Sequence, residues 1–369
     1  MLTRLDVQNY RGFQSFQMDG LARVNLLVGK NNSGKTALLE AFYLLASGGS
    51  PSALTEAAAR RGEMISVREG RDTYPDLTHF FFGHELRVGA SFCLRADNGY
   101  PEFVVRITAL DDPSEQGALF DTERDARLTY GVVFEGAISP WGRERGLGVT
   151  DKGALLLDPR FRGRAGAGPD PRDVRPALFI PTDSLGPRRL AELWSQVILD
   201  ARQTDVVEAM RVIEKGLSQI VFLPLDYNYT SYRSANSPWG IVALLDDTPK
   251  PIPLGSMGDG MRRLLSLATA LSRAGNGVLV IDEVDTGLHY SVMVDMWKLV
   301  IETSKRLGIQ VFAATHSWDC IEGLGDYCRE NPDMACEVAV HKIERSLTQS
   351  VTFSGDRIPS VVENKVEIR

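Results

Sequence analysis

The sequence predicts an α/β fold with a mixed or parallel core sheet, an antiparallel β insertion and a small helical lobe. A buried strand, a glycine-bracketed loop and a helix follow one another over residues 24–42, and strands alternate with helices again in the last third of the chain. Between these regions, residues 85–160 contain short β-rich runs separated by Asp-, Gly- and Pro-containing turns, a pattern typical of antiparallel pairing.

Length and composition restrict the class of protein. The chain has 369 residues, enough for one large domain with insertions or for two domains, and its 43% hydrophobic content is ordinary for a globular protein. The net charge of −7 argues against a protein coated in nucleic acid or bound to anionic lipid, although a local basic groove stays open. With four cysteines, no C-x-x-C pair, no signal peptide and no apolar run of 18 residues, we expect a cytoplasmic protein with reduced, mostly buried thiols and no membrane contact.

The expected elements follow from periodicity and turn signals. They are two short strands within residues 2–20, a strand at 24–28, a helix to Ala46, a helical stretch at 52–61, strands at 86–94, 103–110, 128–134, 154–157 and 178–180, two helices within 188–222 hinged near Gln203, a hairpin over 239–254, a helix after Gly260, a strand at 278–281, a helix at 291–307, a strand at 310–314, and a final helix and hairpin (337–343, 350–353). We expect one domain over 1–369, with 1–84 and 240–369 as the nucleotide-binding core, 85–180 as the β insertion and 181–239 as the helical lobe.

The loop after the strand at 24–28 has the spacing G-x-x-x-x-G-K-[ST], which is the P-loop pattern. Its two glycines allow backbone angles that turn consecutive N–H groups towards a phosphate, and the following helix adds the positive end of its dipole. Lys35 would reach the β- and γ-phosphates, and the Thr36 hydroxyl would bind Mg²⁺. The alternative is a glycine-rich turn with no ligand. The pattern predicts ATP and Mg²⁺ as cofactors, bound by Gly29, Lys30, Asn31, Asn32, Ser33, Gly34, Lys35 and Thr36.

Three further residues are expected at the same sheet edge. Asp282 and Glu283 follow the strand at 278–281, where ligands bind in open α/β sheets. Beside a P-loop, Asp282 would hold Mg²⁺ and Glu283 would activate the attacking water. His316 follows the strand at 310–314 and would sense or stabilise the γ-phosphate. The alternatives are an acidic helix cap for the carboxylates and a histidine without a ligand.

A second anion site is predicted at the start of the helix after Gly260. Ser256, Gly258 and Gly260 precede an apolar helix, and a helix N-terminus attracts anions. One nucleotide does not need two such sites from one subunit, so we expect a homodimer in which these residues contact the γ-phosphate bound by the partner. The alternative is a capping serine in a flexible turn.

The order of these motifs, followed by Asp285–His289 and Thr315–Ser317, resembles an ABC-type ATPase of the SMC/RecF/OLD branch. The opening Asn9–Phe13 is also similar to that branch. The resemblance implies that Arg11 contacts nucleotide and that Asp285 belongs to a loop crossing the dimer interface. Gly-Ser-Met-Gly-Asp-Gly in place of Leu-Ser-Gly-Gly-Gln disfavours a membrane transporter ATPase. Gln116 lies in an acidic turn, so the Q-loop role stays unassigned, and the heptads of SMC arms are absent.

The resemblance implies an ATP-driven dimeric switch that controls a separately encoded effector, such as a nuclease. Stand-alone ATPases of this kind look like the ATPase halves of bacterial anti-phage systems such as Septu and PARIS. With 53 residues after His316 and no Asp-x-Asp strand end, no TOPRIM nuclease is expected within the chain. The main alternative is a RecF-type DNA-repair clamp. Five arginines in the loop 160–175 favour DNA, but they are interleaved with aspartates, so a solvated loop is preferred.

Overall fold

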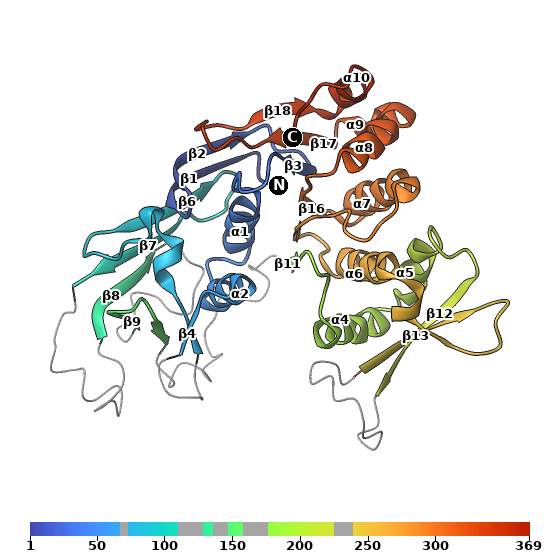
Figure 1. The fold of residues 1–369 in the computed structure, drawn as a ribbon, viewed down its shortest axis with the longest axis horizontal. Helices are drawn as coiled ribbons and strands as arrows, with labels where there is room; N and C mark the ends of the chain where they lie inside the picture. Colours follow the sequence, from blue (N-terminus) through green and yellow to red (C-terminus); the bar gives the residue numbers. More distant parts are fainter. Residues whose placement is uncertain (67–72, 110–127, 136–146, 158–175, 225–238) are drawn as a thin grey trace. The chain divides into compact units, whose positions relative to one another are not determined.

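The computed structural model describes residues 1–66, 73–109, 128–135, 147–157, 176–224 and 239–369. The chain forms two compact units. The antiparallel unit consists of Met1–Leu21, Asn32–Arg175 and Ile343–Val351, and the parallel unit consists of Ala22–Asn31, Pro176–Lys342 and Thr352–Arg369. The combination of parallel and antiparallel sheets with helices confirms the predicted α/β fold (Figure 1).

The parallel unit is built on a six-stranded sheet, ordered β11-β15-β16-β3-β17-β18. The first five of these strands run parallel to their neighbours. Every residue of β3, β15 and β16 is buried, which explains their near-continuous apolar sequences. The bounds are β11 Ala177–Ile180, β15 Val278–Ile281, β16 Gln310–Ala314, β3 Val24–Val28, β17 Val338–Lys342 and β18 Val351–Ser354.

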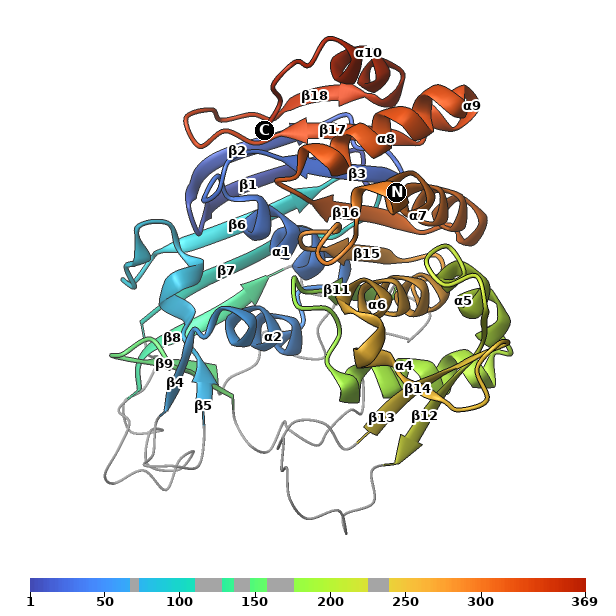
Figure 2. The ribbon, with the colours of Figure 1, turned by 45° about the vertical axis from the view of Figure 1, so that its right-hand side comes forward.

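Three long helices lie side by side on the same side of this sheet (Figures 1 and 2). They are α6 (Asp259–Arg273), α7 (Met293–Leu307) and α8 (Trp318–Glu330), and their buried residues share one core with the strands. The same core includes the helical lobe, in which α4 (Pro187–Leu199) and α5 (Gln203–Met210) pack on α6. The remaining short helices are η5 Leu254–Met257, η6 Tyr290–Val292, α9 Pro332–Ala335, η7 Gly355–Arg357 and α10 Ile358–Glu363.

The helical prediction for residues 188–222 is correct for its first part and wrong for its last part. Helices α4 and α5 meet near Gln203, as expected, but Leu217–Pro224 forms the strand β12. This strand pairs antiparallel with β13 (Trp239–Leu245), which in turn pairs with β14 (Ile252–Pro253) in the predicted hairpin. The Ile-Val-Phe-Leu run within β12 favours a strand, and pairing along β13 outweighs its helix-like spacing.

The antiparallel unit contains a seven-stranded sheet, ordered β10-β9-β8-β7-β6-β1-β2. Its antiparallel pairing was expected, whereas β9 was not predicted and β6 starts later than expected. Helices α1 (Lys35–Ala46) and α2 (Pro51–Arg61), predicted from the sequence, belong to this unit, and α1 packs against β6 (Figure 2). The bounds of the other elements are β1 Arg4–Tyr10, β2 Phe13–Asp19, β4 Met64–Ser66, β5 Thr73–Pro75, η1 Leu77–Phe80, η2 Phe82–His84, β6 Ser91–Ala96, β7 Phe103–Thr108, β8 Leu128–Glu135, β9 Leu147–Thr150 and β10 Leu155–Leu157.

Strand pairing crosses the predicted domain boundaries. Strand β1 pairs with β6, so the region predicted as an insertion continues the sheet that β1 and β2 begin. Strand β11, placed at the end of the same region, belongs to the parallel sheet beside β15. The predicted division of the chain into a core, a β insertion and a helical lobe, with boundaries at residues 84, 180 and 239, stays a prediction.

Two smaller sequence predictions can be compared with the structure. All four cysteines are free, and Cys93, Cys320 and Cys328 are buried whereas Cys336 is exposed. Among the described residues, every helix is too short or too polar to cross a membrane. Gln116 and the arginine-rich loop 160–175 lie outside the described residues.

Candidate nucleotide site

The parallel sheet places the ends of its central strands at one edge. Strands β15, β16 and β3 are neighbours in that order, with Ile281 beside Ala313 and Ala314 beside Leu27. Asp282, Thr315 and Gly29 therefore leave the sheet at the same edge, and β16 alone separates the first from the last. At about 4.8 Å per strand, this edge is narrow enough for one nucleotide to span.

The loop that follows β3 adopts backbone angles that favour glycine. Gly34 has φ 103°, and a Cβ added there would lie 2.3 Å from Cζ of the Phe13 ring. Gly29 (φ 151°) and Asn32 (φ 61°) also have positive φ values. Conformation and space therefore both require glycine at position 34. Residues 29–31 of this loop belong to the parallel unit and residues 32–36 to the antiparallel unit.

The start of α1 fits a phosphate group. The helix begins at Lys35, and the preceding Gly34 offers no side-chain cap for its first N–H groups. Ser33 is 7% exposed, and its Oγ has no hydrogen-bond partner among the described residues. A buried hydroxyl and an uncapped helix start are both satisfied by an anion. Thr36 and Asp282 carry the oxygen donors that Mg²⁺ prefers, and their roles as ligands remain predictions.

Glu283 and His316 are brought together at the sheet edge. The distance between Nδ1 of His316 and Oε2 of Glu283 is 2.6 Å, and the two residues come from the ends of neighbouring strands. Glu283 has φ 48°, a left-handed conformation that is strained for a residue with a side chain. The Val284 N–H donates to the Ala314 carbonyl at 2.9 Å. A carboxylate held in this way can accept a proton from a water molecule.

The loop after Glu283 packs against the start of α6. The Thr315 hydroxyl donates to Oδ1 of Asp285 at 2.6 Å, which fixes the first residue of this loop. A Cβ added at Gly260 would lie 2.9 Å from the Gly287 carbonyl oxygen, so the backbones approach closely. Ser256 and Gly258 are exposed and Gly260 is half-buried. Their predicted contact with a partner's nucleotide remains a prediction.

Arg263, which is fully buried in α6, was not among the residues predicted from the sequence. Its guanidinium donates to four main-chain carbonyl oxygens, those of Pro181 (2.7 Å), Asp282 (2.7 Å), Glu283 (2.8 Å) and Val284 (3.3 Å). Burial lowers the pKa of Arg263 to about 10, although nearby Asp285, Asp282 and Glu283 favour its charged form. An arginine among the apolar residues of an otherwise buried helix face was the signal that could have revealed it.

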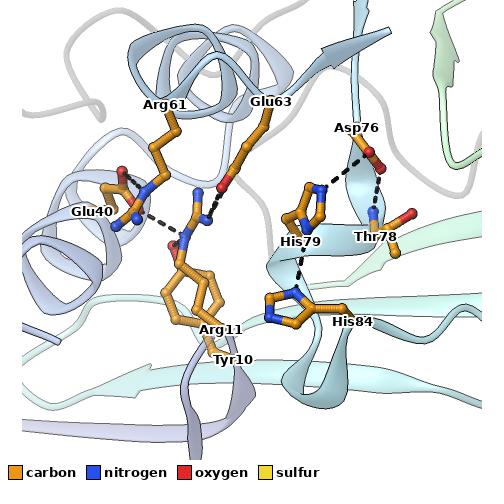
Figure 3. Close-up of polar contacts among 9 residues, drawn as sticks. All are labelled: Tyr10, Arg11, Glu40, Arg61, Glu63, Asp76, Thr78, His79 and His84. Atoms are coloured by element: carbon orange, nitrogen blue, oxygen red, sulfur yellow. Dashed lines mark hydrogen bonds and ion pairs between the residues drawn. The ribbon is translucent and has the colours of Figure 1, made fainter. Parts of the chain in front are cut away.

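Arg11 lies in a buried ionic cluster of the antiparallel unit (Figure 3). Its Nε is 2.8 Å from the Glu40 carboxylate of α1, its Nη1 is 2.9 Å from Glu63, and its guanidinium lies 4.4 Å from the centre of the Phe80 ring. Glu40 also pairs with Arg61. The cluster joins the β1–β2 turn to α1 and to the end of α2. The nucleotide contact that the resemblance implied for Arg11 remains a prediction.

Two family models match the chain. One, described as an AAA domain, putative AbiEii toxin, Type IV TA system, matches residues 177–319, and the other, described as an AAA ATPase domain, matches residues 1–73. An "ATP/GTP phosphatase" of Helicobacter pylori is 23% identical over 387 residues, covering 99% of each chain. RecF proteins of Shewanella baltica (47% identical over 47 residues) and Nitrosococcus oceani (39% over 67 residues) match 13% and 18% of each chain, respectively.

Among solved structures, the SMC head bound to the C-terminal winged-helix domain of ScpA has a TM-score of 0.46 at 12% identity, over 96% of this chain and 98% of that one. The Smc head of Pyrococcus furiosus bound to the C-terminal domain of ScpA has the same TM-score at 10% identity, over 99% of both chains. The family models, together with the P-loop sequence, establish the class of protein. The chain is a P-loop ATPase.

Proposed function

We propose that the protein is an ABC-type ATPase in which ATP closes a homodimer, hydrolysis reopens it, and a separate effector responds to the change. The observation that carries this proposal is the convergence of Gly29, Asp282, Glu283 and Thr315 at one edge of the parallel sheet, with His316 hydrogen-bonded to Glu283. A P-loop that shares its sheet edge with a metal-binding carboxylate and a general base has the groups that ATP hydrolysis needs.

In this mechanism the loop 29–36 and Lys35 hold the phosphates. Thr36 and Asp282 would hold Mg²⁺, which would supply positive charge beside the phosphates when bound. Glu283 orients a water molecule and takes its proton as the water oxygen bonds to the γ-phosphorus and the bond to the ADP oxygen breaks. His316 keeps the carboxylate of Glu283 at the end of its strand.

Two features support a composite site in a dimer. Ser256 and Gly258 are exposed just before α6, and the loop 285–289 packs against Asp259 and Gly260 at the start of this helix. The start of α6 has no side-chain cap and small residues precede it, so a nucleotide phosphate on a second copy would fit this surface. In this arrangement, Arg11 would act on the nucleotide bound by its own subunit, because it lies in the buried cluster with Glu40 of α1 and not on the surface that a partner would contact.

A role in defence, rather than in DNA repair, is favoured by one of the family models. The family model matching residues 177–319 carries a description that refers to a putative toxin of a type IV toxin–antitoxin system. The second candidate is a DNA-repair clamp, favoured by the short matches to RecF. A salt titration of DNA affinity separates the two, because a clamp that contacts several phosphates loses affinity steeply between 50 and 200 mM salt, by about 10³-fold or more.

The composite site is tested by mixing two inactive variants. Lys35→Ala removes the P-loop cation, and Ser256→Arg fills the predicted anion pocket, so neither homodimer has an intact site. In a mixed dimer, one site has the P-loop of one chain and Ser256 of the other. We expect ATPase activity to return on mixing, with differently tagged chains confirming exchange. If mixed dimers form without activity and the Ser256→Arg chain has itself lost ATP affinity, Ser256 acts within its own subunit and the composite site is wrong.

A further inference from the structure

We propose that Arg263 is a positioning residue for hydrolysis, whose guanidinium holds the main chain of the turn 282–284 and thereby places the Glu283 carboxylate. The proposal rests on the proposed role of Glu283 as the base. Helix α6 would then have two functions: its N-terminus would bind the partner's phosphate, and Arg263 within the helix would hold the catalytic turn.

The contacts of Arg263 are specific to the turn. Its Nη2 donates to the carbonyl oxygens of Asp282 and Glu283, at 2.7 and 2.8 Å, and its Nε lies 3.3 Å from that of Val284. Nη1 donates to Pro181, the residue that follows β11, at 2.7 Å. One planar group thus binds three consecutive carbonyls and ties them to the neighbouring strand. Arginine can do this because its five N–H donors form a rigid fork, which lysine lacks.

The turn needs such support because its backbone is strained. Glu283 has φ 48°, and a non-glycine residue keeps this conformation only where its surroundings impose it. On one side, the Val284 N–H donates to Ala314 in β16 and the Asp282 N–H to Ile180 in β11. On the other side the carbonyl oxygens of the same residues point to Arg263, which is fully buried. Without Arg263, the carbonyls of Asp282 and Val284 would lose the guanidinium as a donor in the core, whereas that of Glu283 also accepts from the Thr286 N–H at 3.1 Å.

The consequence is a defined direction for the Glu283 side chain. In the left-handed conformation its carboxylate reaches Nδ1 of His316 at 2.6 Å. Relaxation of the turn to an ordinary conformation would swing the side chain away from His316. Because a displacement of about 1 Å can slow a reaction by about a hundredfold, the effect on turnover should be large while the nucleotide contacts of the P-loop are preserved.

The first test is Arg263→Lys, which keeps the buried charge and loses the fork. We expect turnover to fall by about thirtyfold or more, with ATP affinity within about threefold of wild type. The matched control is Arg202→Lys, because Nη1 of Arg202 also donates to a carbonyl of α6, that of Ser272, at 2.7 Å. The control should retain turnover within about twofold. A fall in ATP affinity equal to the fall in turnover would overturn the proposal.

The second test asks whether Arg263 acts through Glu283. In a Glu283→Gln background, Arg263→Lys should cause no further loss of the residual turnover, because the group that it positions is already absent. If Arg263→Lys causes the same loss in both backgrounds, Arg263 does not act through Glu283 and the proposal is wrong.

The third test needs no nucleotide. Amide hydrogen exchange in the full chain should be at least about tenfold faster over residues 282–286 in Arg263→Lys than in wild type, while exchange in β15 is unchanged. Equal acceleration along β15 and α6 would indicate a role in core stability alone and would overturn the proposal. The exchange rates do not depend on ATPase activity. If Glu283→Gln hydrolyses ATP normally, the proposed role of Glu283 as the base is wrong, but hydrogen exchange still shows whether Arg263 holds the turn.

A measurement on the wild-type protein applies even if Arg263→Lys does not fold. Because both Nη atoms donate hydrogen bonds, the guanidinium of Arg263 should rotate slowly about its Cζ–Nε bond, and ¹⁵N NMR should show separate signals for Nη1 and Nη2. A single averaged signal would show that the guanidinium is not held by the turn, and would overturn the proposal.

Discussion

The two units of the protein bury an arginine in different ways. In the antiparallel unit, Arg11 is paired with two carboxylates, Glu40 and Glu63, and lies over the Phe80 ring. In the parallel unit, the guanidinium of Arg263 donates hydrogen bonds to main-chain carbonyl oxygens, and nearby carboxylates favour its charged form. The first arrangement joins helices and strands by opposite charges, and the second fixes the shape of a turn.

The pKa values of the two arginines reflect this difference. Burial lowers the pKa of both guanidinium groups. For Arg11 the effect of burial is outweighed by Tyr10, Glu40 and Glu63, so that its pKa is raised. For Arg263 burial prevails and the pKa falls to about 10. The charged form of Arg11 is thus stabilised by opposite charges, whereas Arg263 depends on main-chain carbonyl oxygens, which do not outweigh its burial.

The largest expected effect is the loss of the Arg11 cluster. Arg11→Met removes one of the two arginines that pair with the Glu40 carboxylate, which is 1% exposed. Because a buried charge that loses its partner is costly, this substitution should lower the free energy of unfolding by about 3–5 kcal/mol. The unfolding midpoint in urea measures this. The control is Arg4→Met at the start of β1, the strand that Arg11 follows, because the pair of Arg4 with Asp6 is solvent-exposed and should matter little. Equal shifts for the two variants would contradict the comparison.

The next effect concerns chemistry rather than folding. Glu283→Gln should lower ATP turnover by about a hundredfold or more, as expected for the loss of a positioned base, while ATP affinity and the unfolding midpoint stay close to wild type. Steady-state hydrolysis and equilibrium nucleotide binding, measured on the same preparation, check both parts. If ATP affinity collapses instead, Glu283 is a metal ligand or a structural residue, and the sheet edge does not contain the base we assign.

A third, smaller effect is acid sensitivity of the parallel unit. His341 of β17 is fully buried between Asn25 and Thr352, and burial lowers its pKa to about 4. An unfolded histidine titrates near 6.5, so between these values the unfolded state binds more protons and folding weakens as pH falls. From pH 7 to pH 5 the loss should be about 2 kcal/mol. In His341→Gln the corresponding part of the pH dependence should disappear, and an unchanged pH profile would refute the assignment.

The sequence predicted those parts of the molecule that are encoded by adjacent residues. Strands β3, β15 and β16 were predicted with the bounds that the structure shows, because strands buried on both faces are continuously apolar. The P-loop was found from its glycine spacing, and Gly34 proves to be required by both its φ and the neighbouring Phe13 ring.

Features made by distant segments could not be predicted. The role of Arg263 depends on carbonyl oxygens from two other strand ends, and main-chain acceptors leave no signature in a sequence. The partners of Arg11 lie 29 and 52 residues away on α1 and beyond α2. Strand β12 was taken for a helix because its pairing with β13, which follows in the chain, outweighs local spacing.

The smallest expected effect is a change in the free energy of unfolding, which should have opposite signs for substitutions at the two ends of α1. Ser33 precedes the helix, and its buried Oγ has no hydrogen-bond partner in the part of the chain that the structure describes. Ser47 caps the other end, and its Oγ donates to the Leu44 carbonyl at 3.0 Å. A buried hydroxyl without a partner destabilises the folded state by about 1 kcal/mol or more, whereas an ordinary hydrogen bond contributes about 1 kcal/mol.

We therefore expect Ser33→Ala to raise the free energy of unfolding of the nucleotide-free protein by about 1 kcal/mol, and Ser47→Ala to lower it by a similar amount. ATP affinity should change in the other sense, since Ser33→Ala removes a donor to the phosphates and should weaken binding about threefold to tenfold, while Ser47→Ala leaves it unchanged. Urea unfolding without nucleotide and a binding titration with Mg-ATP measure the two quantities. A variant Ser33→Ala that is both less stable and equally good at binding ATP would show that this hydroxyl belongs to the folded core rather than to the nucleotide site.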